Sequence, residues 1–161
     1  MVSAYAAAAP PTVTPAAANA TRLAETSFLR PCVDRAKAFY EAVGFRLDTD
    51  HVTDETYRVV HMTPPGSPCS VLFGTGVTLA APGSSKGLHL IVSDIYEARD
   101  ELVGRGVEVG DVYHDTSDIF HRCTGEKWIS GPDPQRRDYC TYADFTDPDG
   151  NGWVLQEVPN P

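Results

Sequence analysis

The sequence has no long apolar run, no excess of basic residues and no dense cluster of cysteines. No apolar run approaches the length of about 18 residues that a membrane-spanning helix needs. The 161 residues include 13 Lys and Arg against 22 Asp and Glu, and the formal charge of −9 has the wrong sign for binding phosphate backbones or anionic membranes. We therefore expect one globular domain with neither a nucleic acid nor a membrane as its partner.

The cysteines are few and widely separated, and they form no C-x-x-C motif. They are Cys32, Cys69, Cys123 and Cys140. This spacing differs from that of small disulfide-rich secreted domains, so we interpret the four side chains as reduced thiols in a cytoplasmic protein. A glycine-rich loop of the kind that cradles phosphate is also missing.

After an N-terminal tail, the chain contains an internal repeat. Residues 1–22 are rich in Ala, Pro and Thr without hydrophobic periodicity, so we expect a flexible tail. An offset of 62 residues then aligns two predicted amphipathic helices, with Val33 over Ile95 and Gly44 over Gly106. A repeat is the economical explanation of this alignment.

The repeat predicts an α+β chain built from two βαβββ modules, residues 23–86 and 87–160. The first helix is expected over Val33–Val43, and the second follows Asp94, an N-cap residue with Glu97 three positions later. The predicted strands are Glu25–Arg30, Arg46–His51, Tyr57–Thr63, Ser70–Gly74, Leu88–Ser93, Val107–Tyr113, Tyr139–Phe145 and Trp153–Val158.

The second module is longer than the first by about 22 residues, because the equivalent turns at Gly66 and Gly150 lie 84 positions apart. The surplus is expected in an inserted loop at about 113–138. This loop carries the large aromatic residues Tyr113, Phe120 and Trp128. Two interpretations stay open: a lid that covers an apolar ligand, or a loop that its aromatic residues pin to the sheet.

The repeated module, the segment 33–40 leading into Gly44-Phe45, and the closing turn 147–151 together resemble the vicinal oxygen chelate superfamily. This superfamily includes glyoxalase I, extradiol dioxygenases, fosfomycin-resistance enzymes and bleomycin-resistance proteins. The resemblance covers residues 23–158. It implies that the two modules form an incomplete β-barrel around a cavity for a small organic molecule, and that the protein is a homodimer.

The resemblance also implies where a metal would lie. Metal-binding members place ligands at four strand positions, which fall here on Glu25, on Ser70 or Val71, on Gly87 and on Val154. Only Glu25 is a usable donor, so we expect no metal cofactor. His89 and Gln156 each lie two residues beyond an expected ligand, so a divalent metal displaced onto Glu25, His89 and Gln156 remains the alternative.

Two functions follow from the resemblance. The first is a binding protein of the bleomycin-resistance kind, which holds a small molecule without turnover; its candidate ligand contacts are His61, Gln156, Tyr113, Phe120 and Trp128. The second is an enzyme of isomerase, cyclase, lyase or dioxygenase type, in which Glu25 and His89 act as general acid and base or hold the displaced metal. The acidic charge suits a cationic or polyaromatic ligand.

Three further patterns are interpreted as structural. The turn at Asp147 begins like a calcium-binding EF-hand loop, but position twelve is Val158 rather than Glu. His114, His121 and Cys123 match no familiar zinc spacing. The adjacent Arg136 and Arg137 are expected to form a solvated pair.

Overall fold

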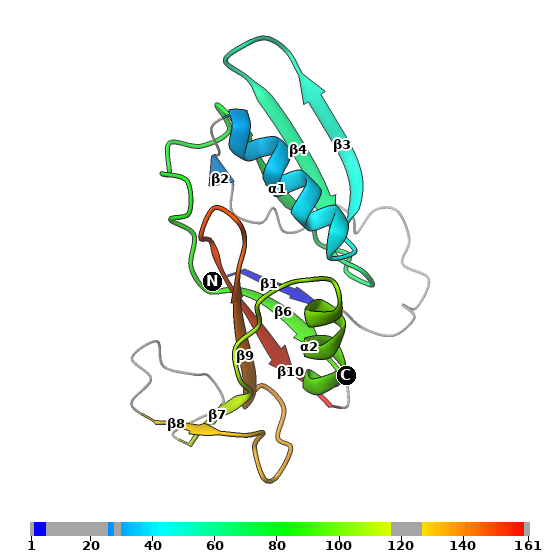
Figure 1. The fold of residues 1–161 in the computed structure, drawn as a ribbon, viewed down its shortest axis with the longest axis vertical. Helices are drawn as coiled ribbons and strands as arrows, with labels where there is room; N and C mark the ends of the chain where they lie inside the picture. Colours follow the sequence, from blue (N-terminus) through cyan, green and yellow to red (C-terminus); the bar gives the residue numbers. More distant parts are fainter. Residues whose placement is uncertain (1, 6–25, 28–29, 117–126, 160–161) are drawn as a thin grey trace.

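The computed structural model describes residues 2–5, 26–27, 30–116 and 127–159, which form two helices and two sheets (Figure 1). The first sheet has the strand order β2-β5-β4-β3 and carries one helix. Its elements are β2 (Thr26–Ser27), α1 (Arg30–Ala42), β3 (Arg46–Val52), β4 (Arg58–Thr63) and β5 (Val71–Thr75).

The second sheet has the strand order β1-β6-β10-β9-β7-β8 and carries the other helix. Its elements are β1 (Val2–Tyr5), β6 (Leu88–Val92), α2 (Ile95–Gly104), β7 (Tyr113–Asp115), β8 (Trp128–Ser130), β9 (Thr141–Thr146) and β10 (Gly152–Glu157). The part of the expected tail that the structure describes, Val2–Tyr5, pairs in parallel with β6.

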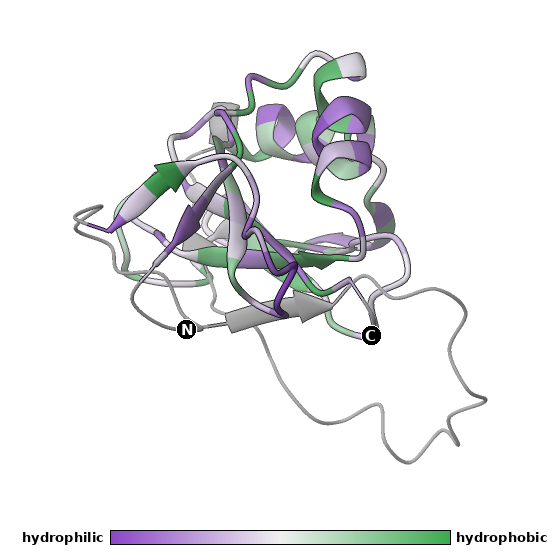
Figure 2. Cartoon of the chain, turned by 90° about the horizontal axis from the view of Figure 1, so that it is seen from below, coloured by the Kyte–Doolittle hydropathy of each residue, from purple (hydrophilic) through white to green (hydrophobic). Residues whose placement is uncertain are grey.

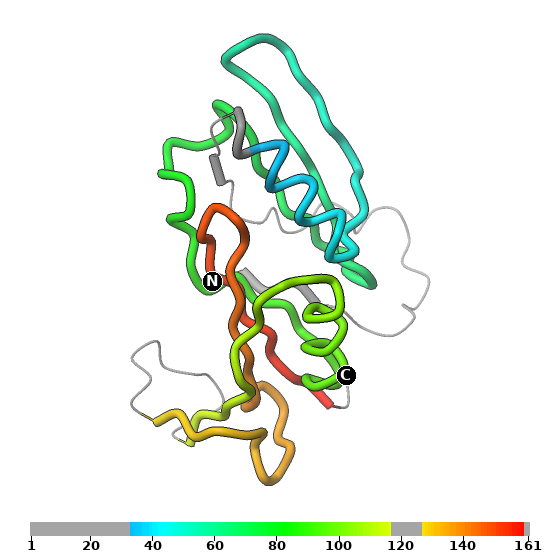
Figure 3. Tube along the Cα trace, viewed as in Figure 1, coloured from blue at the N-terminus to red at the C-terminus, as the bar shows by residue number. Residues whose placement is uncertain are grey.

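The two halves repeat one topology. The β2-β5 and β6-β10 pairs are parallel, whereas β5-β4, β4-β3, β10-β9 and β9-β7 are antiparallel. This arrangement confirms the α+β class and the paired βαβββ modules. The sheets do not close into a barrel within the described residues, and Figures 1 and 3 show them arranged end to end.

Local sequence accounts for both helices. In α1 the residues Val33, Ala36 and Tyr40 form one buried face, which packs against β4 and β5. The helix begins at Arg30, earlier than predicted. The carboxylate of Asp94 accepts hydrogen bonds from the backbone nitrogens of Tyr96 and Glu97, which confirms the predicted N-cap of α2.

The core is continuous across both halves. In the first half, the ring centroid of Tyr40 lies 5.1 Å from that of Phe45 and 5.4 Å from that of Phe73. In the second half, Trp153 lies 5.9 Å from Tyr40, and its indole nitrogen donates to the Tyr40 hydroxyl at 3.2 Å. Aromatic packing therefore joins the two sheets.

The connection between the halves, residues 76–87, also packs against the β9–β10 turn (Figure 3). The backbone nitrogen of Gly152 donates to the Ser85 carbonyl at 2.9 Å, and that of Ser85 donates to Asn151 Oδ1 at 3.1 Å. Gly83 approaches the Asp149 carbonyl so closely that a Cβ there would lie 2.1 Å from its oxygen. These hydrogen bonds and this close contact fix the connection against the second half.

Both helices lie on one side of the strands (Figure 2). We call the opposite side of each sheet its open face, and strand alternation assigns side chains to it. The open face of the first sheet includes Val59, His61, Thr63 and Leu72. The open face of the second sheet includes His89, Ile91, Tyr113, Trp128, Tyr142, Asp144, Val154 and Gln156.

Two segments differ from the sequence prediction. Val107–Tyr113 is predicted as one strand, but it contacts β9 only through the isolated bridge at Val109, the backbone nitrogen of Gly110 and the start of β7 at Tyr113. The Arg99 guanidinium binds the carbonyls of Val109 and Gly110. The inserted loop contains a strand that was not expected, β8, which pairs with β7 as an antiparallel hairpin.

Candidate functional site

Aromatic side chains form a column on the open face of the second sheet. The ring of Tyr113 stacks on Trp128 with a centroid distance of 4.4 Å and an interplanar angle of 28°. Its other neighbour is Tyr142, at 5.5 Å and 32°. Because β8, β7 and β9 are adjacent in the sheet, the column crosses three strands. Tyr142 is fully buried, whereas Tyr113 and Trp128 are half-buried, so the accessible aromatic surface of the column belongs to these two rings.

A carboxylate lies beside this column. The Tyr113 hydroxyl donates to Asp144, with both carboxylate oxygens at 3.1 Å, and both side chains are half-buried. Burial, followed by the negative charge of Asp144, raises the pKa of Tyr113 well above its usual value. Tyr113 therefore remains a neutral donor at physiological pH, and the negative charge at this position is that of Asp144.

Hydrogen-bond chemistry assigns the tautomer of His89. Gln156 Nε2 donates to the Tyr139 carbonyl at 3.1 Å, so the amide oxygen faces His89, 3.1 Å from its Nδ1. A proton must then lie on Nδ1, which leaves Nε2 as the basic nitrogen of the neutral ring. The structure thus brings two predicted residues, His89 and Gln156, into contact, and both are buried.

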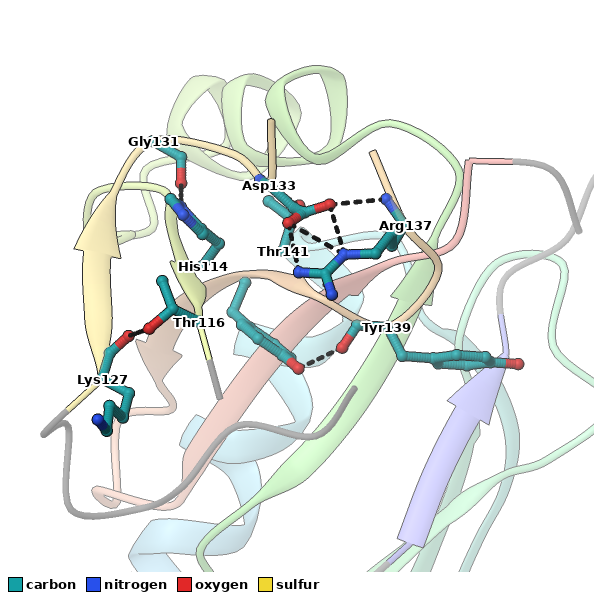
Figure 4. Close-up of polar contacts among 9 residues, drawn as sticks. His114, Thr116, Lys127, Gly131, Asp133, Arg137, Tyr139 and Thr141 are labelled. Carbon is teal, nitrogen blue, oxygen red and sulfur yellow. Dashed lines mark hydrogen bonds and ion pairs between the residues drawn. The ribbon is translucent and has the colours of Figure 1, made fainter. Parts of the chain in front are cut away.

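Residues 131–140 form a strap at the end of this sheet (Figure 4). Buried Asp133 accepts from the backbone nitrogen of Arg137 at 2.9 Å and from its guanidinium at 2.7 Å. These contacts lower the pKa of Asp133 to about 2. His114 Nδ1 lies 2.8 Å from the Gly131 carbonyl, which ties the strap to the β7–β8 hairpin. Thr116 contacts the Lys127 carbonyl at the other end of that hairpin.

The prediction of a solvated arginine pair was wrong. Arg136 binds the fully buried carboxylate of Glu157 at 2.6 Å, while Arg137 binds Asp133. The backbone turns sharply between them and β9, since φ is +49° at Arg136 and +64° at Tyr139. Adjacent arginines can therefore reach two different buried carboxylates.

The other predicted ligand contacts lie apart from the column or outside the described residues. His61 is half-buried on the open face of the first sheet, a different sheet from Tyr113 and Trp128. Glu25 and Phe120 fall outside the described residues, as do His121 and Cys123. The structure therefore brings four of the predicted residues onto one face: His89, Gln156, Tyr113 and Trp128.

Sequence reasoning missed Tyr142 and Asp144. Both lie within the predicted strand Tyr139–Phe145, where alternation places them opposite the buried Ala143 and Phe145. That alternation was the available signal. It could not reveal that Asp144 lies beside Tyr113, because this contact depends on which strands are neighbours.

The donor set does not fit the metal site of the family resemblance. Gly87 and Val154 have no side-chain donor, and Val154 pairs with His89 across β10 and β6. Where side chains are described, no three of His, Cys, Asp or Glu converge as a metal site would require. Of the proposed displaced set, His89 and Gln156 bind each other.

The resemblance to a calcium loop reflects a structural turn, as expected. Asp147 Oδ1 accepts from the backbone nitrogens of Asp149 at 3.0 Å and of Asn151 at 2.8 Å. Its other oxygen accepts from Tyr40 at 2.7 Å, and Asp149 pairs with Arg35. These oxygens hold the turn and the two halves together rather than a cation.

One cavity lies between the two halves, on the side that carries the helices. It is lined by Val43, Phe45, Pro64, Pro65, Leu90, Val92, Ala98, Glu101, Leu102, Phe145 and Leu155. The predicted ligand contacts that the structure describes, His61, Gln156, Tyr113 and Trp128, lie on the opposite faces of the sheets. In addition, no helix in the described ranges is long and apolar enough to cross a membrane.

Comparisons with known proteins agree with this fold. An antibiotic binding protein from Streptomyces sp. CB03234, TnmS3, shares 26% identity over 86% of this chain and 97% of its own, with a TM-score of 0.58. A glyoxalase/bleomycin resistance protein from the same organism shares 28% identity over 83% and 97%, with a TM-score of 0.57. A superfamily member from Sphaerobacter thermophilus DSM 20745 shares 24% over 86% and 98%, with a TM-score of 0.59, which supports the fold alone.

A search of curated proteins found no match. The model of one family, however, matches residues 22–155, which include both helices and all strands from β2 to β9 and most of β10. This chain therefore belongs to the Glyoxalase/Bleomycin resistance protein/Dioxygenase superfamily.

Proposed function

We propose that this protein binds a planar aromatic molecule with a cationic group on the open face of its second sheet. The observation that carries the proposal is the Trp128–Tyr113–Tyr142 column with Asp144 beside it. Aromatic rings stack on planar ligands, and a half-buried carboxylate attracts a cation. The similarity to an antibiotic binding protein supports a ligand of the antibiotic kind.

We further propose that binding needs no metal and takes place in the cytoplasm. The empty ligand positions at Gly87 and Val154 support the first point, since neither side chain offers a donor atom. Cys69, a free thiol, supports the second. The formal charge of −9 favours a cationic ligand at longer range.

One observation favours an enzyme as the second candidate. Gln156 holds His89 with its proton on Nδ1, so Nε2 is the acceptor nitrogen of the neutral ring, the form in which a histidine acts as a general base. In this alternative His89 abstracts or returns a proton of the bound molecule, with Glu25 as its partner. The reaction would be of isomerase, cyclase or lyase type.

We also propose a homodimer. The open faces of both sheets lie on the same side of the chain, so they do not face each other (Figure 2). A second copy related by a two-fold axis would set the first sheet of one chain, with His61 and Leu72, over the aromatic column of the other. Such pairing would enclose the ligand and cover apolar surface on both faces.

Two probes with the same ring system but opposite charge test the binding proposal. Isothermal titration calorimetry should show that 1-naphthylmethylamine binds about fivefold more tightly than 1-naphthoate, the preference expected of one half-exposed carboxylate. Asp144→Asn should remove this preference. Trp128→Ala should weaken binding of both probes by about tenfold through lost stacking.

Ile129→Ala is the matched control, because Ile129 neighbours Trp128 on β8 but is exposed on the other face. Its affinities should equal those of the unmodified protein. Equal binding of the two naphthalenes, or no effect of Trp128→Ala, would overturn the proposal. Bleomycin is the antibiotic probe: a thermal shift that Trp128→Ala abolishes would support an antibiotic ligand.

Recovery of the bleomycin after incubation separates binding from turnover. Mass spectrometry should find it chemically unchanged if the protein only binds. A new product that disappears in His89→Ala would instead support the enzyme. Light scattering at micromolar concentration tests the dimer. We expect a molecular mass of twice the 17.4 kDa chain mass. Val59→Glu, on the open face of the first sheet, should reduce the measured mass to that of a single chain. A monomer before mutation would contradict the dimer.

A further inference from the structure

The cavity between the halves lies on the opposite side of the second sheet from the aromatic column. Its floor consists of Leu90, Leu155 and Phe145, which alternation places beneath α2. Ala98 and Leu102 of α2 form one wall. Residues of the first half close the remaining side: Val43, Phe45, Pro64 and Pro65.

The lining is apolar except for Glu101, and Glu101 is engaged at the rim. Its carboxylate binds Arg105 at 2.6 Å, and another guanidinium nitrogen of Arg105 donates to the Ala42 carbonyl at 3.1 Å. This bridge joins α2 to the end of α1. Apart from Glu101, the lining side chains offer no polar group that would hold water, so this partly open cavity favours an apolar molecule.

The size of the cavity limits the occupant. Its volume is about 120 Å³. An apolar cavity of about 150 Å³ lined by Leu, Ile and Phe takes up benzene. A single ring or a short branched alkyl group therefore fits this space.

We infer that this cavity is a second ligand site, which binds a small uncharged apolar molecule of about one aromatic ring. Exposed Pro65 and Glu101 mark its entrance, one from each half of the chain. Because the walls belong to both halves, an occupant fills the junction between them and stabilises their packing. The inference is independent of the proposed function, which uses the other face of the sheet.

Benzene and fluorobenzene are the probes that test this inference. Fluorine NMR should show saturable binding of fluorobenzene to the full chain, and benzene should displace it. Nuclear Overhauser effects should connect benzene to methyl groups of Leu90 and Leu155. Benzoate should fail to compete, since its negative charge would lie in an apolar cavity whose one charged lining residue, Glu101, is also negative.

A graded series at Ala98 fills the cavity. Ala98→Val adds two carbon atoms and Ala98→Leu adds three, so fluorobenzene affinity should fall progressively, by at least about tenfold for leucine. Ala80→Leu is the matched control, because Ala80 is exposed in the connection between the halves, away from the cavity lining. The valine variant keeps the test valid if leucine prevents folding.

Three results would overturn the inference. The first is no saturable binding of fluorobenzene. The second is affinity that does not change across the Ala98 series. The third is binding lost in Trp128→Ala but retained in Ala98→Leu, which would assign the arene to the aromatic column instead. Loss of naphthalene binding alone would contradict only the proposed function.

Discussion

The hydroxyl of Tyr40 lies at the boundary between the halves. It donates to Asp147 at 2.7 Å and accepts from the Trp153 indole at 3.2 Å, and the side chain is 2% exposed. Burial, together with Asp147, raises the pKa of Tyr40 well above its usual value, so the proton of this hydroxyl stays in place. One oxygen atom thus serves two buried partners.

Tyr40→Phe should lower the free energy of unfolding by about 1–3 kcal/mol, because the aspartate and the indole each lose a buried partner. Urea denaturation at neutral pH measures the change. Tyr96→Phe is the control. Tyr96 is exposed on α2, so removal of its hydroxyl should leave the free energy of unfolding almost unchanged. A loss no larger than that of the control would contradict this role.

Asp133 should make part of the stability depend on acid pH. Its pKa is about 2 in the folded chain, whereas an unfolded aspartate titrates near about 4. The folded form therefore binds protons less tightly, and the stabilisation is complete above about pH 4 and lost as the pH falls toward about 2.

The melting temperatures of the unmodified protein and of Asp133→Asn measure this effect. The variant should melt at a lower temperature at pH 7, and the difference should shrink as the pH falls below about 4. Asp138→Asn, at an exposed position in the same strap, should show no such convergence. A difference that is constant with pH would show that the charge of Asp133 is not involved.

At the scale of elements, the connection of residues 76–87 is held by close backbone contact with the β9–β10 turn. Gly83 and Gly87 provide a matched pair within it, because φ is +72° at Gly83 and +70° at Gly87. An added Cβ would meet the Asp149 carbonyl oxygen at 2.1 Å at Gly83, but nothing within 4 Å at Gly87. The two glycines share a conformation and differ in contact.

Both alanine variants should therefore incur the cost of a left-handed residue, about 1–2 kcal/mol. Only Gly83→Ala should also displace the turn, so its urea midpoint should lie clearly below that of Gly87→Ala. Equal midpoints would indicate that the contact between the connection and the turn does not contribute to stability.

Elements defined by local chemistry could be predicted from the sequence. The α2 helix follows from Asp94 and its apolar stripe, because capping and periodicity involve residues within one or two turns. The prediction of a continuous strand over Val107–Tyr113 failed because strand pairing depends on residues distant in the sequence: the segment contacts β9 at only three of its residues, and the Arg99 side chain binds two of its carbonyls. Similarly, β8 exists only where the inserted loop returns to β7.

The candidate site was predictable to the same extent. Alternation along β6 and β10 correctly placed His89 and Gln156 on one face, since that inference needs only the period of a strand. The contacts of Asp144 with Tyr113, and of Arg136 with Glu157, depend on strand order and on the backbone turn in the strap. Neither is encoded in residue spacing.

At the scale of the whole molecule, the shared aromatic core predicts cooperative unfolding. Trp153 of the second half packs on Tyr40 at 5.9 Å and Phe45 at 6.0 Å, both from the first half. Loss of either half would expose this core. We therefore expect the halves to unfold together.

Trp128→Phe leaves Trp153 as the single tryptophan of the chain, which has two. Its fluorescence reports on the junction, whereas far-UV circular dichroism reports on all helices and strands. The urea midpoints of the two signals should coincide. A fluorescence change that precedes the loss of secondary structure would show that the halves separate before they unfold.

The packing of the connection against the β9–β10 turn has a consequence for recombination between relatives. A crossover placed at the module boundary, after residue 86, would join residues 82–86 of one parent to a turn from another. The hydrogen bonds of Ser85 with Asn151 and Gly152, and the close approach at Gly83, would then have to survive in a hybrid pair. Working chimeras should inherit residues 82–87 and 147–152 from the same parent. The segment that can be exchanged with the first module therefore ends before residue 82, within the connection.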